Sequence, residues 1–229
     1  MQNPASIKGM QFLDADNWTG RTCIKLMLPF CNLRCPWCNE RELVLAAHLL
    51  PSLDSREVLA SIAQKKQTVG LVVFSGGEPM MHRALEGLLQ NVKALGLDTA
   101  VETNGTQPDF VEHLIKRGLL DYVAVDIKAD LTDEAYSRAA GVSMPASLVM
   151  ETLERVSDSG INAVLRTTLV PGIVTPEDIL ALAARLEGFL TWRISPFVGG
   201  NTLDPDFPLE SSFSATQIKD LQRQVETLL

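Results

Sequence analysis

The sequence predicts an α/β fold with a parallel sheet and helices outside it. Six short apolar runs rich in Val and Ile indicate buried strands, and six segments with apolar residues at a 3.6-residue period indicate helices. The two kinds of segment alternate along the chain, which is typical of βα units. A partial barrel and an open doubly wound sheet both fit this pattern, and both gather functional residues at the carboxyl ends of the strands.

The predicted elements follow one another without a repeat, a low-complexity segment or a linker, so we expect a single domain over residues 1–229. The expected strands are 22–28, 70–74, 98–103, 121–127, 162–170 and 191–197. The expected helices lie near 54–66, 82–95, 108–117, 146–159, 176–187 and 214–228.

The composition narrows the function classes. Hydrophobic residues make up 46% and charged residues 21% of the chain, which supports a sizeable core. A net charge of −8 argues against a nucleic-acid surface, which would be basic. No apolar run reaches the roughly 18 residues of a membrane span, and the N-terminus lacks the apolar segment of a signal peptide. We therefore expect a cytoplasmic protein without nucleic-acid or membrane partners, in which clustered cysteines indicate metal or redox chemistry.

Three of the four cysteines lie in the stretch "CNLRCPWCNE", residues 31–40, directly after the first predicted strand. Pro29 and Pro36 argue for irregular backbone there. A structural zinc site usually has four protein ligands, and the fourth would be His48 or Cys23, which lies back along the strand. A cluster of four irons normally takes four cysteines, so three would leave one iron open to a small molecule.

The C-x3-C-x2-C spacing, with Trp37 just before the last cysteine, resembles the signature of the radical S-adenosylmethionine (radical SAM) superfamily. The resemblance spans about residues 20–208 and implies a partial (β/α)6 TIM-like barrel with parallel strands and outer helices. It implies a [4Fe-4S] cluster whose open iron is chelated by the amino and carboxylate groups of S-adenosyl-L-methionine, with Trp37 among the residues that bind the cofactor. The implied cluster ligands are Cys31, Cys35 and Cys38.

Two glycines follow the second predicted strand in "FSGGEP", residues 74–79. Such a pair lets the backbone approach a ligand closely or adopt positive φ, although an ordinary βα turn fits equally well. The stretch resembles the family's GGE motif. This implies that Gly76, Gly77 and Glu78 receive the methionine ammonium group of S-adenosylmethionine.

The third predicted strand ends in "VETNG", residues 101–105. Because side chains alternate along a strand, Glu102 and Asn104 share a face, and a carboxylate with an amide suits the two hydroxyls of a ribose. A solvated loop with an Asn-Gly turn is the structural alternative. The resemblance implies that Glu102 occupies the family's ribose-binding position, with Asn104 beside it.

Charged residues stand on the two following strands. Asp126 and Lys128 share the inward face of "VAVDIK", where they could form an ion pair or bind a ligand. Arg166, in "VLRTTLVPG", can grip a carboxylate or form a salt bridge that closes the barrel. Both stretches resemble those of glycyl-radical-enzyme activases, which implies that Lys128 lies near cofactor and peptide and Arg166 near the methionine carboxylate. We predict that Asp126, Lys128 and Arg166 are catalytic.

The resemblance implies reductive cleavage of S-adenosylmethionine to a 5′-deoxyadenosyl radical that abstracts a hydrogen atom. The stretch "ISPFVGGNTLDPDF", residues 194–207, resembles the end of the activating proteins of anaerobic ribonucleoside-triphosphate reductase. The first hypothesis is therefore that the hydrogen atom is taken from a glycine of such a partner enzyme. Two departures stand out: Val198 lies where several activases carry His, and Phe30 where many carry Gly.

Two other functions fit parts of the sequence. The first is a small-molecule radical SAM enzyme such as one like 7-carboxy-7-deazaguanine synthase, which the missing His favours. The second is a non-catalytic iron–sulfur or zinc protein, which requires "SGGEP", "ETNG" and Arg166 to be coincidences.

Four basic residues flank the cysteine stretch in an otherwise acidic chain. They are Arg21, Lys25, Arg34 and Arg41. One-electron donors such as flavodoxin and ferredoxin are acidic, and opposite charge accelerates encounter. The residues therefore indicate a docking surface for such a donor, or else only a solvated face.

Overall fold

The computed structural model describes residues 6–15, 19–186, 191–208 and 213–229. Within these residues seven strands form one sheet in chain order, from β1 to β7. β1 is antiparallel to β2, whereas β2, β3 and β4 are parallel, as are β6 and β7. The strands are β1 Gly9–Leu13, β2 Cys23–Leu28, β3 Leu71–Gly76, β4 Asp98–Thr103, β5 Tyr122–Asp126, β6 Asn162–Leu169 and β7 Thr191–Pro196. The predicted α/β class is confirmed.

The strand order decides between the two architectures that the sequence left open. A doubly wound sheet reverses its order at a switch point, whereas here each strand follows its predecessor in one direction. Because crossover connections are right-handed, such an order puts the connecting helices on one face, as in a barrel. β1 and β7 stand at the two ends of the order, so the sheet is open. The expected partial (β/α)6 barrel is confirmed.

All six expected helices are present among the described residues, although residue 187 of the expected segment 176–187 lies outside them. They are α2 Ser55–Lys65, α3 Leu85–Ala94, α4 Pro108–Lys116, α6 Ser147–Ser159, α7 Pro176–Arg185 and α8 Ala215–Leu228. Four short helices were not expected: α1 Arg41–Leu45, α5 Asp133–Ala140 and the 3-10 turns η1 Ala47–Leu49 and η2 Pro79–Met81.

The chain folds into two compact units, each built from several segments. The first unit consists of Met1–Asn32, Glu42–Thr103 and Asp109–Ala124. The second consists of Leu33–Arg41, Asn104–Pro108 and Val125–Leu229. The three-cysteine loop is therefore divided, since Cys31 belongs to the first unit while Cys35 and Cys38 belong to the second.

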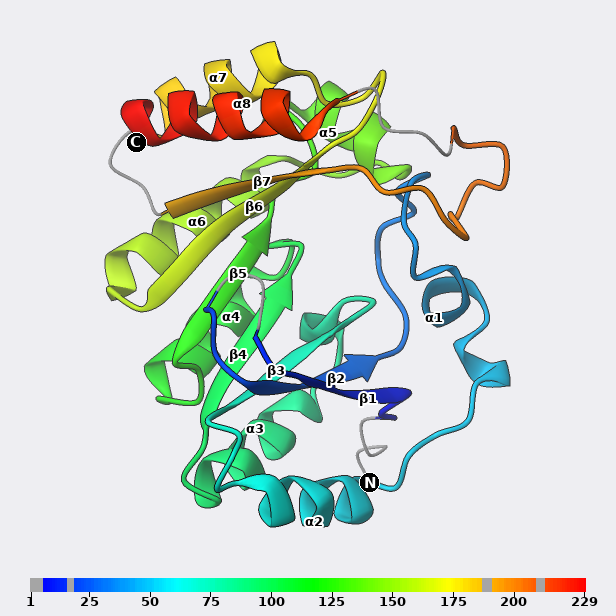
Figure 1. Ribbon diagram of the computed structural model, residues 1–229, viewed down its shortest axis with the longest axis vertical. Coiled ribbons are helices and arrows are strands. Elements are labelled where there is room, and N and C mark those ends of the chain that lie inside the picture. The colour runs from blue at the N-terminus through cyan, green and yellow to red at the C-terminus, as the bar shows by residue number, and fades with distance from the viewer. Residues whose placement is uncertain (1–5, 16–18, 187–190, 209–212) are drawn as a thin grey trace. The chain divides into compact units, whose positions relative to one another are not determined.

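The first unit contains β1 to β4, and in Figure 1 helices α2 and α3 lie below β1, β2 and β3. Helix α2 begins where the side chain of Asp54 accepts hydrogen bonds from the backbone N–H groups of Arg56 and Glu57, which satisfies its otherwise unpaired first turn. Cys23 is fully buried in a core cluster with Leu71, Val73 and Ala100.

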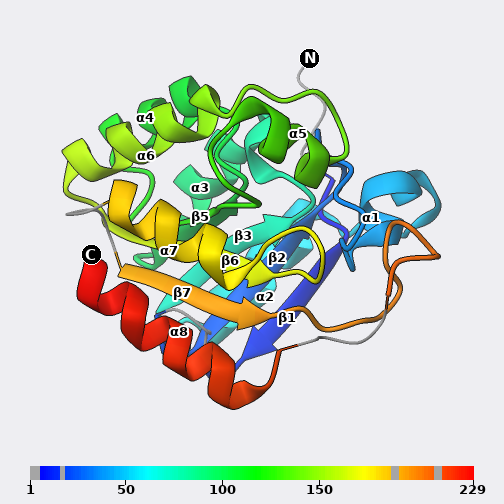
Figure 2. The same cartoon turned by 90° about the horizontal axis from the view of Figure 1, so that it is seen from above.

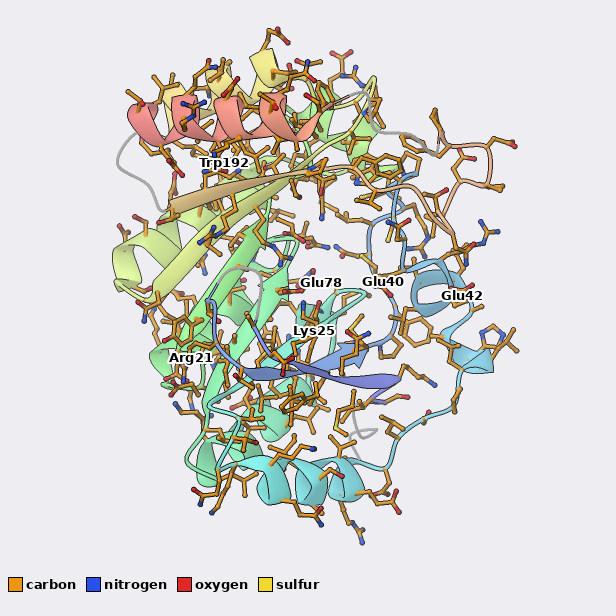
Figure 3. The ribbon with its side chains drawn as sticks, viewed as in Figure 1. Arg21, Lys25, Glu40, Glu42, Glu78 and Trp192 are labelled. Atoms are coloured by element: carbon orange, nitrogen blue, oxygen red, sulfur yellow. The ribbon has the colours of Figure 1, made fainter. Side chains whose placement is uncertain are left out.

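The second unit contains β6, β7 and helices α5 to α8. Helices α7 and α8 lie side by side next to β7 (Figures 1 and 2). Trp192 of β7, labelled in Figure 3, is fully buried, and its indole N–H donates to Thr167. Gln222 of α8 donates to the carbonyl of Trp192 and accepts from the N–H of Ile194, so its side chain covers backbone groups of this edge strand.

Candidate active site

The turn after β3 is bound to the segment that leads into the cysteine loop. The N–H of Gly77 donates to the carbonyl of Leu28 at 2.8 Å, and the N–H of Glu78 donates to that of Phe30 at 2.7 Å. A Cβ on Gly77 would lie 1.8 Å from the Phe30 carbonyl oxygen, so only glycine fits there. The Gly-Gly pair thus lets the turn after β3 lie close to the backbone of residues 28–30 of the same chain.

Phe30, directly before Cys31, is the one described non-glycine residue with positive φ, at 61°. Such a conformation is unfavourable for a bulky side chain and persists only where the surroundings impose it. Here the N–H of Phe30 donates to the carbonyl of Leu43, and its carbonyl accepts from Glu78. Glycine would adopt the same conformation without strain, and the side chain of Phe30 is 46% exposed.

Glu78 is buried at the carboxyl end of β3. Its Oε1 atom accepts hydrogen bonds from the N–H of Met80 at 3.0 Å and from the hydroxyl of Thr103 at 2.7 Å. Because these donors fix the carboxylate, it presents acceptor atoms in a set direction, which suits the recognition of an ammonium group.

Glu102 is also buried, and both of its carboxylate oxygens have partners. Oε1 accepts from the ammonium of Lys25 at 2.8 Å, and Oε2 accepts from the hydroxyl of Ser75 at 2.5 Å. The sequence singled out Glu102 but neither of these partners in this role. A lysine in the middle of the apolar strand "CIKLML" was the available signal, because a buried ammonium requires a counter-charge.

In the second unit, Cys35 and Trp37 are buried, and Cys38 is partly buried. This part of the loop is attached to the segment after β7: the carbonyls of Cys38 and Pro36 accept from the N–H groups of Leu203 and Asp204. Arg41 donates to the carbonyls of residues 202 and 203, and Asn39 to that of Val198. The segment that resembles the end of the activases therefore braces the cysteine loop.

Three charged residues of the second unit form one network. Arg166 donates two hydrogen bonds to Asp126, at 2.7 and 3.1 Å, and Lys128 donates to the same carboxylate at 3.2 Å. Burial alone would raise the pKa of Asp126, but Arg166 and Lys128 outweigh it and hold that pKa well below its usual range. Of the alternatives that the sequence left open, the structure shows the ion pair of Asp126 with Lys128 and a salt bridge from Arg166, while the catalytic roles of these residues stay predictions.

Lys128 is also close enough to the cysteines and to Tyr136 to interact with them electrostatically. Burial alone would lower the pKa of Lys128, but Asp126 raises it, so the ammonium stays charged. Burial raises the pKa of the Cys38 thiol, which Lys128 opposes. Burial likewise raises the pKa of Tyr136. A thiol of this kind loses its proton when a metal binds to the sulfur.

Asn104 lies at the end of "VETNG" in the second unit, almost fully buried. Its side-chain oxygen accepts from the N–H and from the hydroxyl of Thr106. The amide thus closes a turn of the Asx type, as the structural alternative expected, but the turn is buried and not solvated.

The prediction that four basic residues form a surface around the cysteine loop is wrong for two of them. Arg21 lies at the amino end of β2, where it binds Asp98 and the carbonyl of Gly70, and Lys25 points inward to Glu102. Figure 3 shows the two side chains apart along the strand. Arg34 is exposed, whereas the guanidinium of Arg41 is used within the loop bracing.

The donor set in the loop fits a thiolate-bound metal cluster. None of the four cysteines, all of which the structure describes, forms a disulfide, and the three in the loop have the spacing of a cluster-binding motif in irregular backbone. In the part of the chain that the structure describes, no three His, Cys, Asp or Glu side chains are grouped closely enough to hold a metal ion. None of the described helices is long and apolar enough to cross a membrane.

Comparison with known proteins gives one family. The Radical SAM superfamily matches residues 26–186, which is most of the chain. This range includes every predicted site residue from Cys31 to Arg166.

Several curated relatives match over most of their length, among them the following two. One, from Methanocaldococcus jannaschii, is 25% identical over 89% of this chain and 84% of its own; its assignment as glycyl-radical enzyme activating enzyme MJ1227 is provisional. The other, the 7-carboxy-7-deazaguanine synthase of Hyperthermus butylicus, is 28% identical over 78% of this chain and 82% of its own. Among solved structures, Streptococcus suis SuiB bound to S-adenosylmethionine has a TM-score of 0.67 at 16% identity. That likeness covers 88% of this chain but only 48% of SuiB, and it concerns the fold.

Proposed function

This chain belongs to the radical SAM superfamily, and from this premise we propose that it activates a glycyl radical enzyme, an anaerobic ribonucleotide reductase. The enzymes of the family use a [4Fe-4S] cluster and S-adenosylmethionine. When bound, these supply an organic radical by one-electron cleavage of the sulfonium, and the radical takes a hydrogen atom from the substrate. The observation that supports the activase is the likeness to the Methanocaldococcus protein over 89% of this chain.

In this proposal Cys31, Cys35 and Cys38 hold the cluster, and Trp37 lies beside the cofactor. The irregular loop suits this task, because its backbone is bound on one side to the turn after β3, within the first unit, and on the other to the segment after β7, within the second. These bonds hold each part of the loop within its own unit without help from a metal, which lowers the entropy lost when the thiolates bind iron.

The remaining site residues bind S-adenosylmethionine in the proposal. Glu78, with Gly76 and Gly77, takes the ammonium group, and Glu102 takes the ribose, with Asn104 beside it. Arg166 takes the methionine carboxylate. A guanidinium has five N–H donors, of which Asp126 accepts two. Asp126 and Lys128 then keep Arg166 in place, and the charge of Lys128 lies near the substrate.

A second candidate function is a small-molecule reaction like that of the 7-carboxy-7-deazaguanine synthases. The Hyperthermus enzyme matches over 82% of its own length, at slightly higher identity than the activase. Val198, where several activases carry His, is 68% exposed after β7. An exposed valine offers no acid–base group to a peptide substrate, which favours this candidate.

The test compares two substrates on one preparation. The anaerobically reconstituted, dithionite-reduced protein should cleave S-adenosylmethionine slowly to 5′-deoxyadenosine without substrate. Adding an anaerobic ribonucleotide reductase should accelerate cleavage and produce a glycyl radical doublet in electron paramagnetic resonance, with oxygen-dependent scission of the partner at that glycine. If the doublet never forms and the synthase substrate is consumed instead, the second candidate replaces the first.

A further inference from the structure

We propose that Lys25 is a positioning residue that aims the carboxylate of Glu102 at the ribose of S-adenosylmethionine, with Ser75 as its counterpart on the other carboxylate oxygen. The inference rests on the proposed function, in which Glu102 binds that ribose. It gives Lys25 a role inside the site, whereas its charge and place in the sequence suggested a surface role.

The three residues come from three adjacent strands of the first unit. Lys25 lies on β2, Ser75 on β3 and Glu102 on β4, and these strands pair in parallel in this order. Each strand therefore supplies one member of a chain of hydrogen bonds across the sheet, from the Lys25 ammonium to Oε1 and from the Ser75 hydroxyl to Oε2. Strands held in a ladder fix the distance between such groups better than loops do.

Burial distinguishes this ion pair from the surface pairs of the protein. The side chains of Lys25 and Glu102 are 16% and 8% exposed. A solvated pair is held loosely because water competes for both charges, whereas a pair at this depth has few alternative partners. The two donors therefore restrict the orientation of the carboxylate.

The fixed carboxylate can still accept hydrogen bonds from a ligand. Each carboxylate oxygen has two lone pairs, so a donor from Lys25 or Ser75 does not fill its oxygen. A carboxylate held in this way can accept from two neighbouring hydroxyls at once. Without Lys25, the Oε1 atom of Glu102 would lose its 2.8 Å partner, which alters what the carboxylate offers to a ribose.

The central variant is Lys25→Met, which keeps most of the side-chain volume and removes the charge. The matched control is Lys93→Met. Lys93 on α3 forms a 2.8 Å ion pair with Asp121 in the same unit and is 30% exposed, so its loss also breaks a lysine–carboxylate pair. Iron content and visible absorption verify cluster loading, and calorimetry on the anaerobic, oxidised protein measures the affinity for S-adenosylmethionine.

We expect Lys25→Met to retain the cluster and to bind S-adenosylmethionine about tenfold more weakly, as when a group that orients a ligand-binding side chain is removed. Lys25→Arg should restore part of the affinity, and Lys93→Met should bind like the parent protein. Saturating S-adenosylmethionine should recover the cleavage rate of Lys25→Met, so that KM rises while kcat is kept.

A double-mutant cycle separates the inference from the proposed function. Glu102→Gln should weaken binding, and Lys25→Met added to Glu102→Gln should weaken it little further. If Glu102→Gln binds normally, the ribose assignment of Glu102 fails. If Glu102→Gln binds weakly while Lys25→Met binds normally, or if the two losses simply add, the positioning role of Lys25 is overturned. Should Lys25→Met not fold, Lys25→Arg and Ser75→Ala decide in its place, and normal affinity in both would reject the inference.

Discussion

Basic residues that are close in sequence have different tasks in this protein. Arg21 binds Asp98, the carbonyl of Gly70 and the hydroxyl of Tyr122, and so joins the amino ends of neighbouring strands. Its pKa is raised chiefly by the hydrogen bond to Asp98. Lys25, four positions later, faces the site residue Glu102. Position along the strand, and not charge alone, decides whether such a residue supports the fold or the site.

The cysteines give the first prediction. Replacing Cys31, Cys35 or Cys38 by Ala should abolish the absorption near 400 nm that is expected for a thiolate-bound iron–sulfur cluster. Cys23→Ala should keep it, because Cys23 is fully buried among Leu71, Val73 and Ala100 in the core. Absorption spectra and iron analysis of the reconstituted variants provide the measurement, and loss of the cluster in Cys23→Ala alone would refute the ligand assignment.

A second prediction concerns Gly77. In Gly77→Ala the new methyl group would lie 1.8 Å from the carbonyl oxygen of Phe30, so the backbone must move and the bonds between residues 77–78 and 28–30 are disturbed. We expect a loss of about 2–3 kcal/mol in the free energy of unfolding, typical of overpacking. Urea unfolding of the apoprotein measures it.

Gly87 is the matched control for this substitution. A Cβ there meets nothing within 4 Å, and Gly87 lies inside α3. Gly87→Ala should therefore stabilise the protein by about 0.5–1 kcal/mol, as in an exposed helix. Equal effects of the two substitutions would contradict the steric argument for Gly77.

At the scale of elements, the strands of the sheet were the most predictable part. β4 spans Asp98–Thr103, as the sequence predicted, although "DTAVET" carries acidic and hydroxyl residues beside its two apolar ones. β1 was missed, since "GMQFL" pairs on one side with β2 and is half exposed, so its composition carries no strong pattern. Helix α5 was missed because it has only eight residues, although Thr132 caps it.

The candidate site was predictable as motifs but not as contacts. The sequence indicated Asp126, Lys128 and Arg166 because charges are rare in buried strands, and the structure joins them in one ion-pair network. It could not show that Gly77 is needed for contact with Phe30, because that distance depends on two turns far apart in sequence. The bracing of the cysteine loop by residues 198–204 was hidden for the same reason.

The third prediction follows from the lowered pKa of Asp126. In the unfolded chain this pKa lies near 3.8, and in the folded protein well below it, so the unfolded state binds more protons in acid. The ion pair therefore stabilises the fold above about pH 5 and loses this effect progressively as the pH falls below 3.8. Asp126→Asn should cost about 2–3 kcal/mol at pH 7, since the pair is only partly buried, and less in acid.

Unfolding of the apoprotein in urea between pH 3 and 7 measures this difference. Asp130→Asn is the control, because Asp130 pairs with the half-exposed Arg185 and should contribute little at any pH. A constant difference between the parent protein and Asp126→Asn across the range would show that charge on Asp126 is not the cause.

Because the whole molecule has a net charge of −8, a local positive charge has a large influence on the rate at which it encounters acidic partners. Arg34, in the cysteine loop, is the exposed member of the basic residues predicted there. We propose that flavodoxin or ferredoxin supplies the electron, so Arg34→Glu should slow reduction by flavodoxin severalfold at low salt and leave dithionite-driven cleavage unchanged. Stopped-flow reduction of the cluster measures the rate.

Lys219→Glu is the control for this fourth prediction, because Lys219 is exposed on α8 and the substitution changes the net charge by the same amount. Equal slowing by both substitutions would show that overall charge, and not a docking surface at the loop, governs the encounter.

The bracing of the cysteine loop also sets an order of events during protein synthesis. Asn39 and Val198 are 159 positions apart, and the backbone partners of Pro36 and Cys38 lie beyond Val198. At a synthesis rate of roughly 5–20 residues per second, about 10–30 s separate the emergence of the cysteine loop from that of residues 198–204, which hold it. A ribosome-bound chain therefore exposes Cys35 and Cys38 in a loop that is not yet held. Metal delivered to the nascent chain would meet thiols in a mobile loop that are exposed to oxidation. We therefore expect productive cluster insertion to follow synthesis of residues 198–204.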